Sequence, residues 1–181
     1  MNKIIYENGP LTVETSLSSV NAPARVINQF AYGKERSLAI LSSDEVVFFF
    51  AYEDLLGGVK LDQEASLRGD LKESMKAFLE KEHADPKKVI CYFAPSLTFS
   101  HVHVERSLQE ELIERGYRAA CKRTDRVDFL DLPLLNLLYL RELGIPMANI
   151  EVSGYGTFET PYLASKANGK EGENLNLANL R

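Results

Sequence analysis

Short apolar stretches, alternating or continuous, dominate the first third of the chain, which is typical of β-strands. They predict strands at residues 11–15, 25–27, 37–41, 46–50 and 59–61. The stretch 46–50 is apolar without alternation, as expected of a strand that is covered on both faces. Asn21-Ala22-Pro23 and Gly57-Gly58 have the composition of turns, so we expect the chain to change direction at both places.

Apolar residues at helical spacing follow. The first predicted helix has Ser66 as its N-cap and ends before Asp85-Pro86. Its inward face is expected to consist of Leu67, Leu71, Met75, Phe78 and Leu79. A central strand is predicted at residues 89–93.

Two further helices are predicted in the second half. One spans residues 104–115 and stops at Gly116, after which residues 117–121 read as a strand. The other starts near Asp131, with Pro133 in its first turn, and is apolar on nearly every side, so we expect it to be well buried.

A last clear strand is predicted at residues 149–152, and the polar, Gly-rich segment 166–173 predicts a mobile loop. We find no repeat and no linker. The pattern predicts one α/β or α+β domain over residues 1–181, a layered sandwich with a central mixed β-sheet flanked by helices.

Composition and charge narrow the classes of function. With 45% hydrophobic and 26% charged residues the chain has the make-up of a soluble globular protein, and its net charge of -5 disfavours binding to nucleic acid or to an anionic membrane. No apolar run approaches the roughly 20 residues that a membrane span requires. Residues 1–10 lack a basic region followed by an apolar stretch, so we expect no secretory signal and a cytoplasmic protein.

Six short motifs, in order along the chain, resemble the YfiH/YlmD family of laccase-domain proteins. Glu64-Ala65-Ser66-Leu67-Arg68-Gly69 resembles the family signature His-Ala-Gly-Trp-Arg-Gly, and Ser42-Ser43-Asp44-Glu45 resembles Thr-Ala-Asp-Cys. The other four are Ala94-Pro95-Ser96-Leu97 with Val102-His103-Val104, Asp131-Leu132-Pro133-Leu134-Leu135-Asn136, Asn149-Ile150-Glu151-Val152-Ser153-Gly154 and the closing stretch from Gly172 to Leu177. The resemblance identifies the chain as a divergent member, shortened on its N-terminal side.

This resemblance implies a metal-dependent enzyme. The family is associated with purine nucleoside phosphorolysis and deamination and with laccase-like phenol oxidation (polyphenol oxidase activity), at a zinc or copper site of two His and one Cys. The Cys is replaced here by Glu45 and one His by Glu64, and the other His has no counterpart. Near the C-terminus the family's Cys-Thr pair becomes Gly156-Thr157. We therefore predict no metal ligands and no cofactor.

Four residues remain candidates for chemistry. Glu45 and Glu64 could act as acid and base, or hold a harder ion such as magnesium, manganese or calcium; the alternative is that both are solvated charges. Arg68, with Asp44, is a candidate for binding substrate or phosphate, because a guanidinium at a helix start suits an anion. The alternative for Arg68 is an ion pair with Glu64 or with a neighbouring acidic residue.

The histidines and cysteines carry weaker signals. His101 and His103 have the spacing of a metal-binding pair if both lie in one strand, but a surface or hydrogen-bonded role is expected for them. Cys91, in a predicted central strand, is expected to pack as a reduced thiol. Cys121 precedes two basic residues, which could lower its pKa.

Three functions follow from these observations. The first is a family member that has lost the metal site, non-catalytic or altered in activity, with a pocket for a nucleoside or a phosphate. The second is an active enzyme of the purine nucleoside phosphorylase type that uses Glu45, Glu64 and Arg68. The third is a protein-interaction module, a homodimer built on the helix after Asp131 or on an exposed sheet edge.

Overall fold

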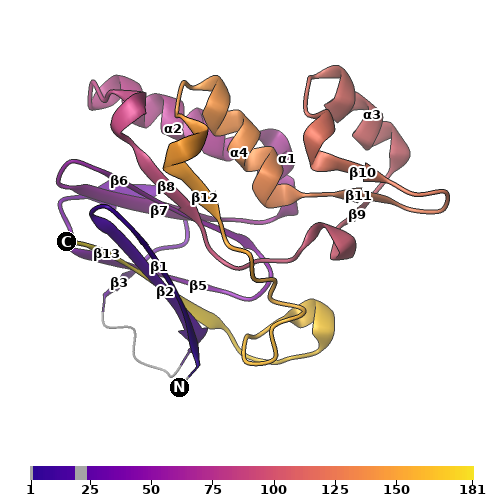
Figure 1. The fold of residues 1–181 in the computed structure, drawn as a ribbon, viewed down its shortest axis with the longest axis horizontal. Coiled ribbons are helices and arrows are strands. Elements are labelled where there is room, and N and C mark those ends of the chain that lie inside the picture. The colour runs from indigo at the N-terminus through magenta and orange to yellow at the C-terminus, as the bar shows by residue number, and fades with distance from the viewer. Residues whose placement is uncertain (1, 19–23) are drawn as a thin grey trace.

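The computed structural model describes residues 2–18 and 24–181 and contains three layers (Figure 1). Two five-stranded sheets lie face to face, and helices cover the outer face of one of them. The turn predicted at Asn21-Ala22-Pro23 lies outside the described residues. The α/β class and the mixed sheets are as predicted. The second layer on the central sheet is another sheet, so helices flank it on one face.

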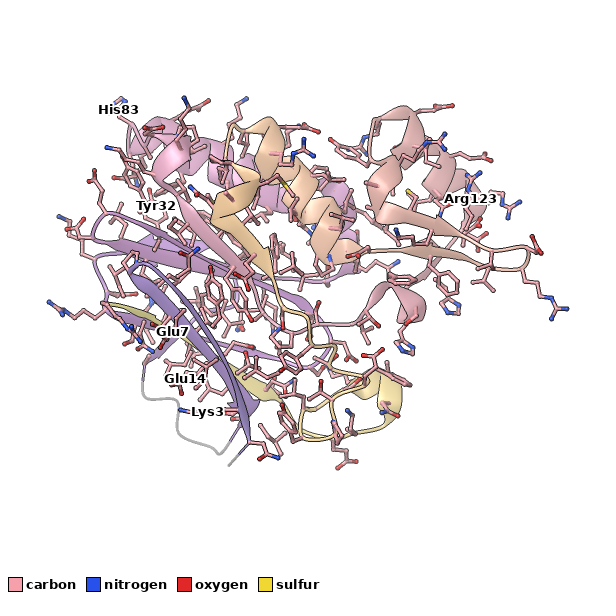
Figure 2. The ribbon with its side chains drawn as sticks, in the orientation of Figure 1. Lys3, Glu7, Glu14, Tyr32, His83 and Arg123 are labelled. Atoms are coloured by element: carbon pink, nitrogen blue, oxygen red, sulfur yellow. The ribbon has the colours of Figure 1, made fainter. Side chains whose placement is uncertain are left out.

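The outer sheet contains the first and the last strand of the described chain. Its strands, in spatial order, are β1 (Lys3–Asn8), β2 (Leu11–Leu17), β13 (Asn174–Leu180), β5 (Ser37–Ser42) and β3 (Arg25–Val26). All neighbours are antiparallel except β3 and β5. Figure 2 shows Lys3, Glu7 and Glu14 on the β1–β2 hairpin, away from the helices.

The central sheet carries the helices. Its strands, in spatial order, are β12 (Ile150–Val152), β8 (Ile90–Phe93), β6 (Val46–Tyr52), β7 (Leu55–Leu61) and β4 (Ala31–Gly33). Strands β8 and β12 are parallel, and the other pairs are antiparallel. The helices over this sheet are α1 (Gln63–Arg68), α2 (Asp70–Lys81) and α4 (Leu132–Glu142), whereas α3 (Arg106–Glu114) lies to one side of it (Figure 1). A small antiparallel sheet stands to one side, formed by β9 (His103–Val104), β10 (Cys121–Arg123) and β11 (Asp128–Leu130).

Strand β6 belongs to both hydrophobic cores, and all seven of its residues are buried. Phe48 and Phe50 point into the core beneath the helices, whereas Val47 and Phe49 point into the core between the two sheets. Side chains alternate between the faces of a strand, so an unbroken apolar run can fill two cores at once. The prediction of a strand covered on both faces is confirmed.

The prediction of a turn at Gly57-Gly58 is wrong, because both glycines lie within β7 opposite Phe50 and Phe49. An aromatic ring lies close over each of them: a Cβ on Gly57 would be 2.3 Å from Cε1 of Phe50. The turn occurs earlier, at Glu53. Glycine in a strand often marks a position where another group approaches the backbone closely, and at Gly57 and Gly58 that group is an aromatic ring.

The predicted single helix after residue 66 is two helices. Asp62, not Ser66, is the N-cap of α1 and accepts a hydrogen bond from the Ala65 N–H at 2.7 Å. Gly69, with φ of 78°, ends α1 and leads into α2. Ser66 is fully buried, and its hydroxyl accepts a hydrogen bond from the side-chain amide of Asn136 on α4 at 3.0 Å.

Two other boundaries differ from prediction, and two strands were missed. Residues 104–105 precede α3, with Val104 in β9, and the strand predicted at 117–121 begins instead at residue 121, after a 3-10 turn at Arg118–Ala120. Strand β1 was not predicted. Strand β13 was also missed because two of its inward positions are occupied by Asn174 and Asn176, while Leu175 and Leu177 lie on its outer face.

The close packing over β7 makes a testable prediction. In the variant Gly57→Ala the new methyl group meets the Phe50 ring and the Cβ of Tyr32, so we expect a loss of about 2–3 kcal/mol in the free energy of unfolding. Urea denaturation followed by circular dichroism measures it. Gly154→Ala, which has no atom within 4 Å of its new Cβ, is the matched control and should change little; equal effects at both positions would contradict the packing argument.

Candidate functional site

The turn between β5 and β6, residues 43–45, is fastened to the C-terminal part of the chain by Asp44. One oxygen of its carboxylate accepts a hydrogen bond from the Thr157 hydroxyl at 2.7 Å, and the other accepts one from the Ala167 N–H at 2.9 Å. Both carboxylate oxygens are therefore engaged inside the protein. The role that the structure supports for Asp44 is to position this turn.

Two buried amides on β13 hold the same region from below. Asn174, which is 1% exposed, exchanges hydrogen bonds with the N–H and carbonyl of Ala164 and donates to the Ser43 carbonyl. Asn176 donates to the Ser42 hydroxyl at 2.9 Å and accepts from the Thr15 hydroxyl at 2.8 Å. Buried polar groups need such partners, since an unpaired one costs free energy. The two amides thus join three segments that are far apart in the sequence.

The segment 156–170 is closed by the ammonium group of Lys170. It donates hydrogen bonds to the carbonyl oxygens of Thr157, Phe158 and Thr160 at 2.7, 3.1 and 2.8 Å. Residues 165 and 170 also form a β-bridge, and Lys166–Asn168 is a 3-10 turn. The stretch predicted to be a mobile loop is therefore tied to its surroundings by several hydrogen bonds.

Glu45 directs one carboxylate oxygen at its own turn. This oxygen accepts hydrogen bonds from the N–H groups of Ser43 and Asp44 at 2.8 and 3.2 Å. Burial raises the pKa of Glu45, but the backbone hydrogen bonds and the positive charges of Lys60 and Lys166 outweigh burial, and the pKa lies below its ordinary value. Glu45 is therefore an ionised carboxylate at neutral pH.

Glu64 and Arg68 lie on the exposed side of α1. The Glu64 side chain is 81% exposed and forms an ion pair with Arg68 at 3.0 Å. The Arg68 guanidinium also donates two hydrogen bonds to the Asp70 carboxylate, at 3.2 and 2.7 Å. Of the two alternatives for Arg68, the structure contains the ion pair.

A hollow of about 210 Å³ opens between the turn at 43–46, the start of α1 and the segment 97–102. It is lined by Ser43, Asp44, Glu45, Val46, Leu61, Asp62, Gln63, Leu97, His101, Val102, Leu132 and Lys166. Two of the four predicted site residues, Asp44 and Glu45, meet here, whereas Glu64 and Arg68 are not among the lining residues. The pattern analysis missed Asp62 and Lys166. Asp62 could have been found as the N-cap of the helix, because Asp is a common capping residue, but the N-cap was assigned to Ser66 instead.

His101 also borders the hollow and is held on two sides. Its Nε2 lies 3.0 Å from the Glu159 carboxylate, and its ring stacks on Phe158 with 3.7 Å between ring centroids. The Glu159 carboxylate also accepts a hydrogen bond from the Thr98 hydroxyl at 2.7 Å. His103 lies in β9 against Phe129, so the two histidines have separate partners. The hydrogen-bonded role expected for His101 is confirmed.

The two cysteines are unpaired. Cys91 is buried in β8, where burial raises the pKa of its thiol. Burial also raises the pKa of Cys121 above its ordinary value, and it outweighs the lowering by Arg123, which acts in the predicted direction, and by Arg118. Among residues 2–18 and 24–181, no group of three or more His, Cys, Asp and Glu residues is arranged to hold a metal ion.

The buried hydrogen bonds of Asn174 predict an effect on the stability of the protein. Asn174→Ala leaves the Ala164 N–H and carbonyl without their buried partners, and we expect a loss of about 2–4 kcal/mol in the free energy of unfolding. Asn179→Ala is the matched control on the same strand, where the partly exposed amide accepts one hydrogen bond from Ser37, and we expect it to cost less than about 1 kcal/mol. Denaturant titration of both variants decides; equal costs would refute the assigned role of Asn174.

The lowered pKa of Glu45 predicts a pH dependence of stability. A carboxylate whose pKa is lower in the folded state than in the unfolded chain stabilises the protein above the unfolded pKa of about 4.3, and this contribution disappears as the pH falls through the folded pKa. The difference in unfolding free energy between wild type and Glu45→Gln should therefore shrink from neutral pH towards pH 3. Glu80→Gln, at an exposed site, controls for the change of charge. A difference that is constant or grows on acidification would be evidence against this description.

Comparison with known proteins places the chain in a family. Residues 63–180, from α1 through β13, match the family described as multi-copper polyphenol oxidoreductase laccase. No protein with curated function is significantly similar in sequence.

Three solved structures have a similar fold. They are Bacillus licheniformis hypothetical protein YfiH (TM-score 0.73, 19% identity, covering 84% of this chain and 61% of that one), YlmD from Geobacillus stearothermophilus (0.72, 21%, 85% and 61%) and Neisseria meningitidis protein NMB0706 of the DUF152 family (0.77, 13%, 99% and 99%). The chain thus spans about three fifths of the YfiH and YlmD chains. Since the family match covers well over half of the 181 residues, this chain belongs to the laccase-domain (YfiH) family.

Proposed function

We propose that this protein is a laccase-domain family member that has lost the His/Cys/His metal chemistry of the family and binds a small molecule in the hollow bordered by Glu45 and His101. The carrying observation is the placement of Glu45 and Glu64. One carboxylate oxygen of Glu45 accepts hydrogen bonds from the N–H groups of its own turn, and Glu64 forms an ion pair with Arg68 and does not line the hollow.

The donor set supports the loss of the metal chemistry. Zinc and copper favour thiolate and imidazole ligands, and the two positions that would supply them hold carboxylates here. Glu45 borders the hollow, whereas Glu64 is not among its lining residues and is paired with Arg68, which argues against a shared carboxylate site for a harder ion. No catalytic step is assigned to a metal ion.

The competing reading, a working purine nucleoside phosphorylase, requires Glu45, Glu64 and Arg68 to act on one substrate. The placement of the three residues argues against it, because only Glu45 borders the hollow and the Arg68 charge is already neutralised by two acidic partners. A homodimer built on α4 has little support, since most of this helix is buried within the chain. A dimer through a sheet edge stays a prediction that light scattering tests.

The proposal includes a cytoplasmic location. Two unpaired cysteines, one buried and one partly buried, suit a reducing compartment. The helices of the described residues include none long and apolar enough to cross a membrane.

The decisive experiment combines metal analysis with activity. The purified chain, incubated with zinc or copper and then dialysed, should retain far less than one ion per chain by mass spectrometry. It should release no ribose 1-phosphate from inosine or adenosine in phosphate buffer, and oxidise no phenol, above the rate without protein. An unrelated purine nucleoside phosphorylase serves as the positive control of the assay.

The opposite result is equally clear. A stoichiometric metal ion together with phosphorolysis would overturn the proposal. If that activity also disappeared in Glu64→Ala and in Arg68→Ala while both variants stayed folded, the active-enzyme reading would take its place.

A further inference from the structure

The hollow has an apolar floor and a charged rim. Its apolar lining residues are Val46, Leu61, Leu97, Val102 and Leu132, and four of the five are buried. Such a floor accommodates the hydrocarbon part of a ligand, while a few polar groups determine its orientation. The hollow is small compared with the roughly 300–1,000 Å³ of pockets for drug-sized ligands, so its ligand is small.

The rim is negative. Among the lining residues, Asp44, Glu45 and Asp62 contribute three carboxylates and Lys166 contributes one ammonium group, which leaves two negative charges when His101 is neutral. The Lys60 ammonium, which also acts on Glu45, lies outside the lining and donates to the Leu41 carbonyl, so the excess is smaller but still negative. An anionic ligand such as phosphate would be repelled by this excess, while a cation would be attracted. The phosphate ligand expected from the resemblance is therefore disfavoured by charge.

Two carboxylate oxygens of the rim are available to a ligand. The hydrogen bonds of Glu45 are made by Oε2 and that of Asp62 by Oδ1, and within the described part of the chain the other oxygen of each has no hydrogen-bond partner. Ser43 also lines the hollow, but its Oγ is buried below the surface, so a ligand in the hollow does not reach this hydroxyl. The unused groups are thus two carboxylate oxygens.

We propose that the hollow binds a small molecule that carries an ammonium group on a short aliphatic body. An ammonium group has three N–H donors, two of which match the unused oxygens of Glu45 and Asp62, and its charge offsets the excess on the rim. The aliphatic body lies on the apolar floor. This inference rests on the proposed function in taking the hollow as a ligand site, and it adds the chemical class of the ligand.

Lys166 opposes such a ligand. Its ammonium group lies close enough to help lower the pKa of Glu45, and its side chain is exposed. Removing this charge should strengthen the binding of a cation and weaken that of an anion. A variant at this exposed position also leaves the buried hydrogen bonds of the region intact.

Three probes of similar size test the inference: n-butylamine, 1-butanol and butyrate each contain four carbon atoms and differ in the charge of the head group. Each is titrated into the full ¹⁵N-labelled chain at pH 7, with backbone amide shifts as the readout. We expect n-butylamine to shift the amides of residues 43–46 and 61–63 and to bind at least about tenfold more tightly than 1-butanol, as a charge-assisted hydrogen bond predicts. Butyrate and inorganic phosphate should cause no saturable shift there.

Variants then assign the binding to the rim. Asp62→Asn keeps an N-cap on α1, because Asn caps as well as Asp, and should bind n-butylamine about tenfold more weakly. Lys166→Gln should bind it about twofold to fivefold more tightly. Glu80→Gln makes the same change of charge on α2, away from the hollow, and should leave the affinity unchanged.

Several outcomes would overturn the inference. Butyrate or phosphate that binds as tightly as n-butylamine would do so, as would an unchanged affinity in Asp62→Asn, or the absence of saturable shifts with all probes. Calcium or manganese that perturbs the same amides in place of the amine would assign the rim to a metal ion. The proposed function fails separately, through bound zinc or copper with phosphorolysis, so the two failures are distinguishable.

Discussion

The candidate site depends on hydrogen bonds made by side chains buried beneath it. Asn174 and Asn176 occupy inward positions of a central strand of the outer sheet, where apolar residues would otherwise be expected. Their amides satisfy backbone groups of the turn at 43–45 and of Ala164, and Asp44 adds the connection to residues 157 and 167. Apolar packing is tolerant of direction, whereas paired amides fix their partners in place. The outline of the hollow is thus specified by polar groups inside the protein.

Much of the fold could be predicted from the sequence because its central strand is extreme in composition. The apolar run of β6 indicates burial on both faces, and the structure contains two cores around it. The predictions failed at residues whose local sequence pattern suggests one structure while their contacts in the folded protein require another. Gly57-Gly58 resembles a turn but accommodates aromatic rings, and the inward amides of Asn174 and Asn176 invert, in the first half of β13, the alternation by which a strand is recognised. Neither role is visible until the neighbouring strand is known.

The site was less predictable than the fold. The motifs led to Asp44 and Glu45 through the turn that carries both, and these residues do border the hollow. The motifs also led to Glu64 and Arg68, which do not line the hollow. Asp62 does line it, although it lies only two residues before Glu64 in the sequence. A sequence motif alone does not make this distinction. His101 and Lys166 lie far along the chain from this turn. The hydrogen bonds of Asp44 with Thr157 and Ala167 bring the segment of Lys166 to it, and the Leu97 N–H, which donates to the Asp44 carbonyl, brings the segment of His101. Their neighbourhood follows from tertiary structure alone.

Gly156 has a consequence for the position of His101. A Cβ at this position would lie 2.1 Å from a carboxylate oxygen of Glu159 and 2.5 Å from Thr98, so any other residue requires the Glu159 side chain to move. This side chain is the hydrogen-bond partner of both Thr98 and His101. The absence of a side chain at residue 156 is thus what leaves room for the carboxylate that holds His101 at the border of the hollow.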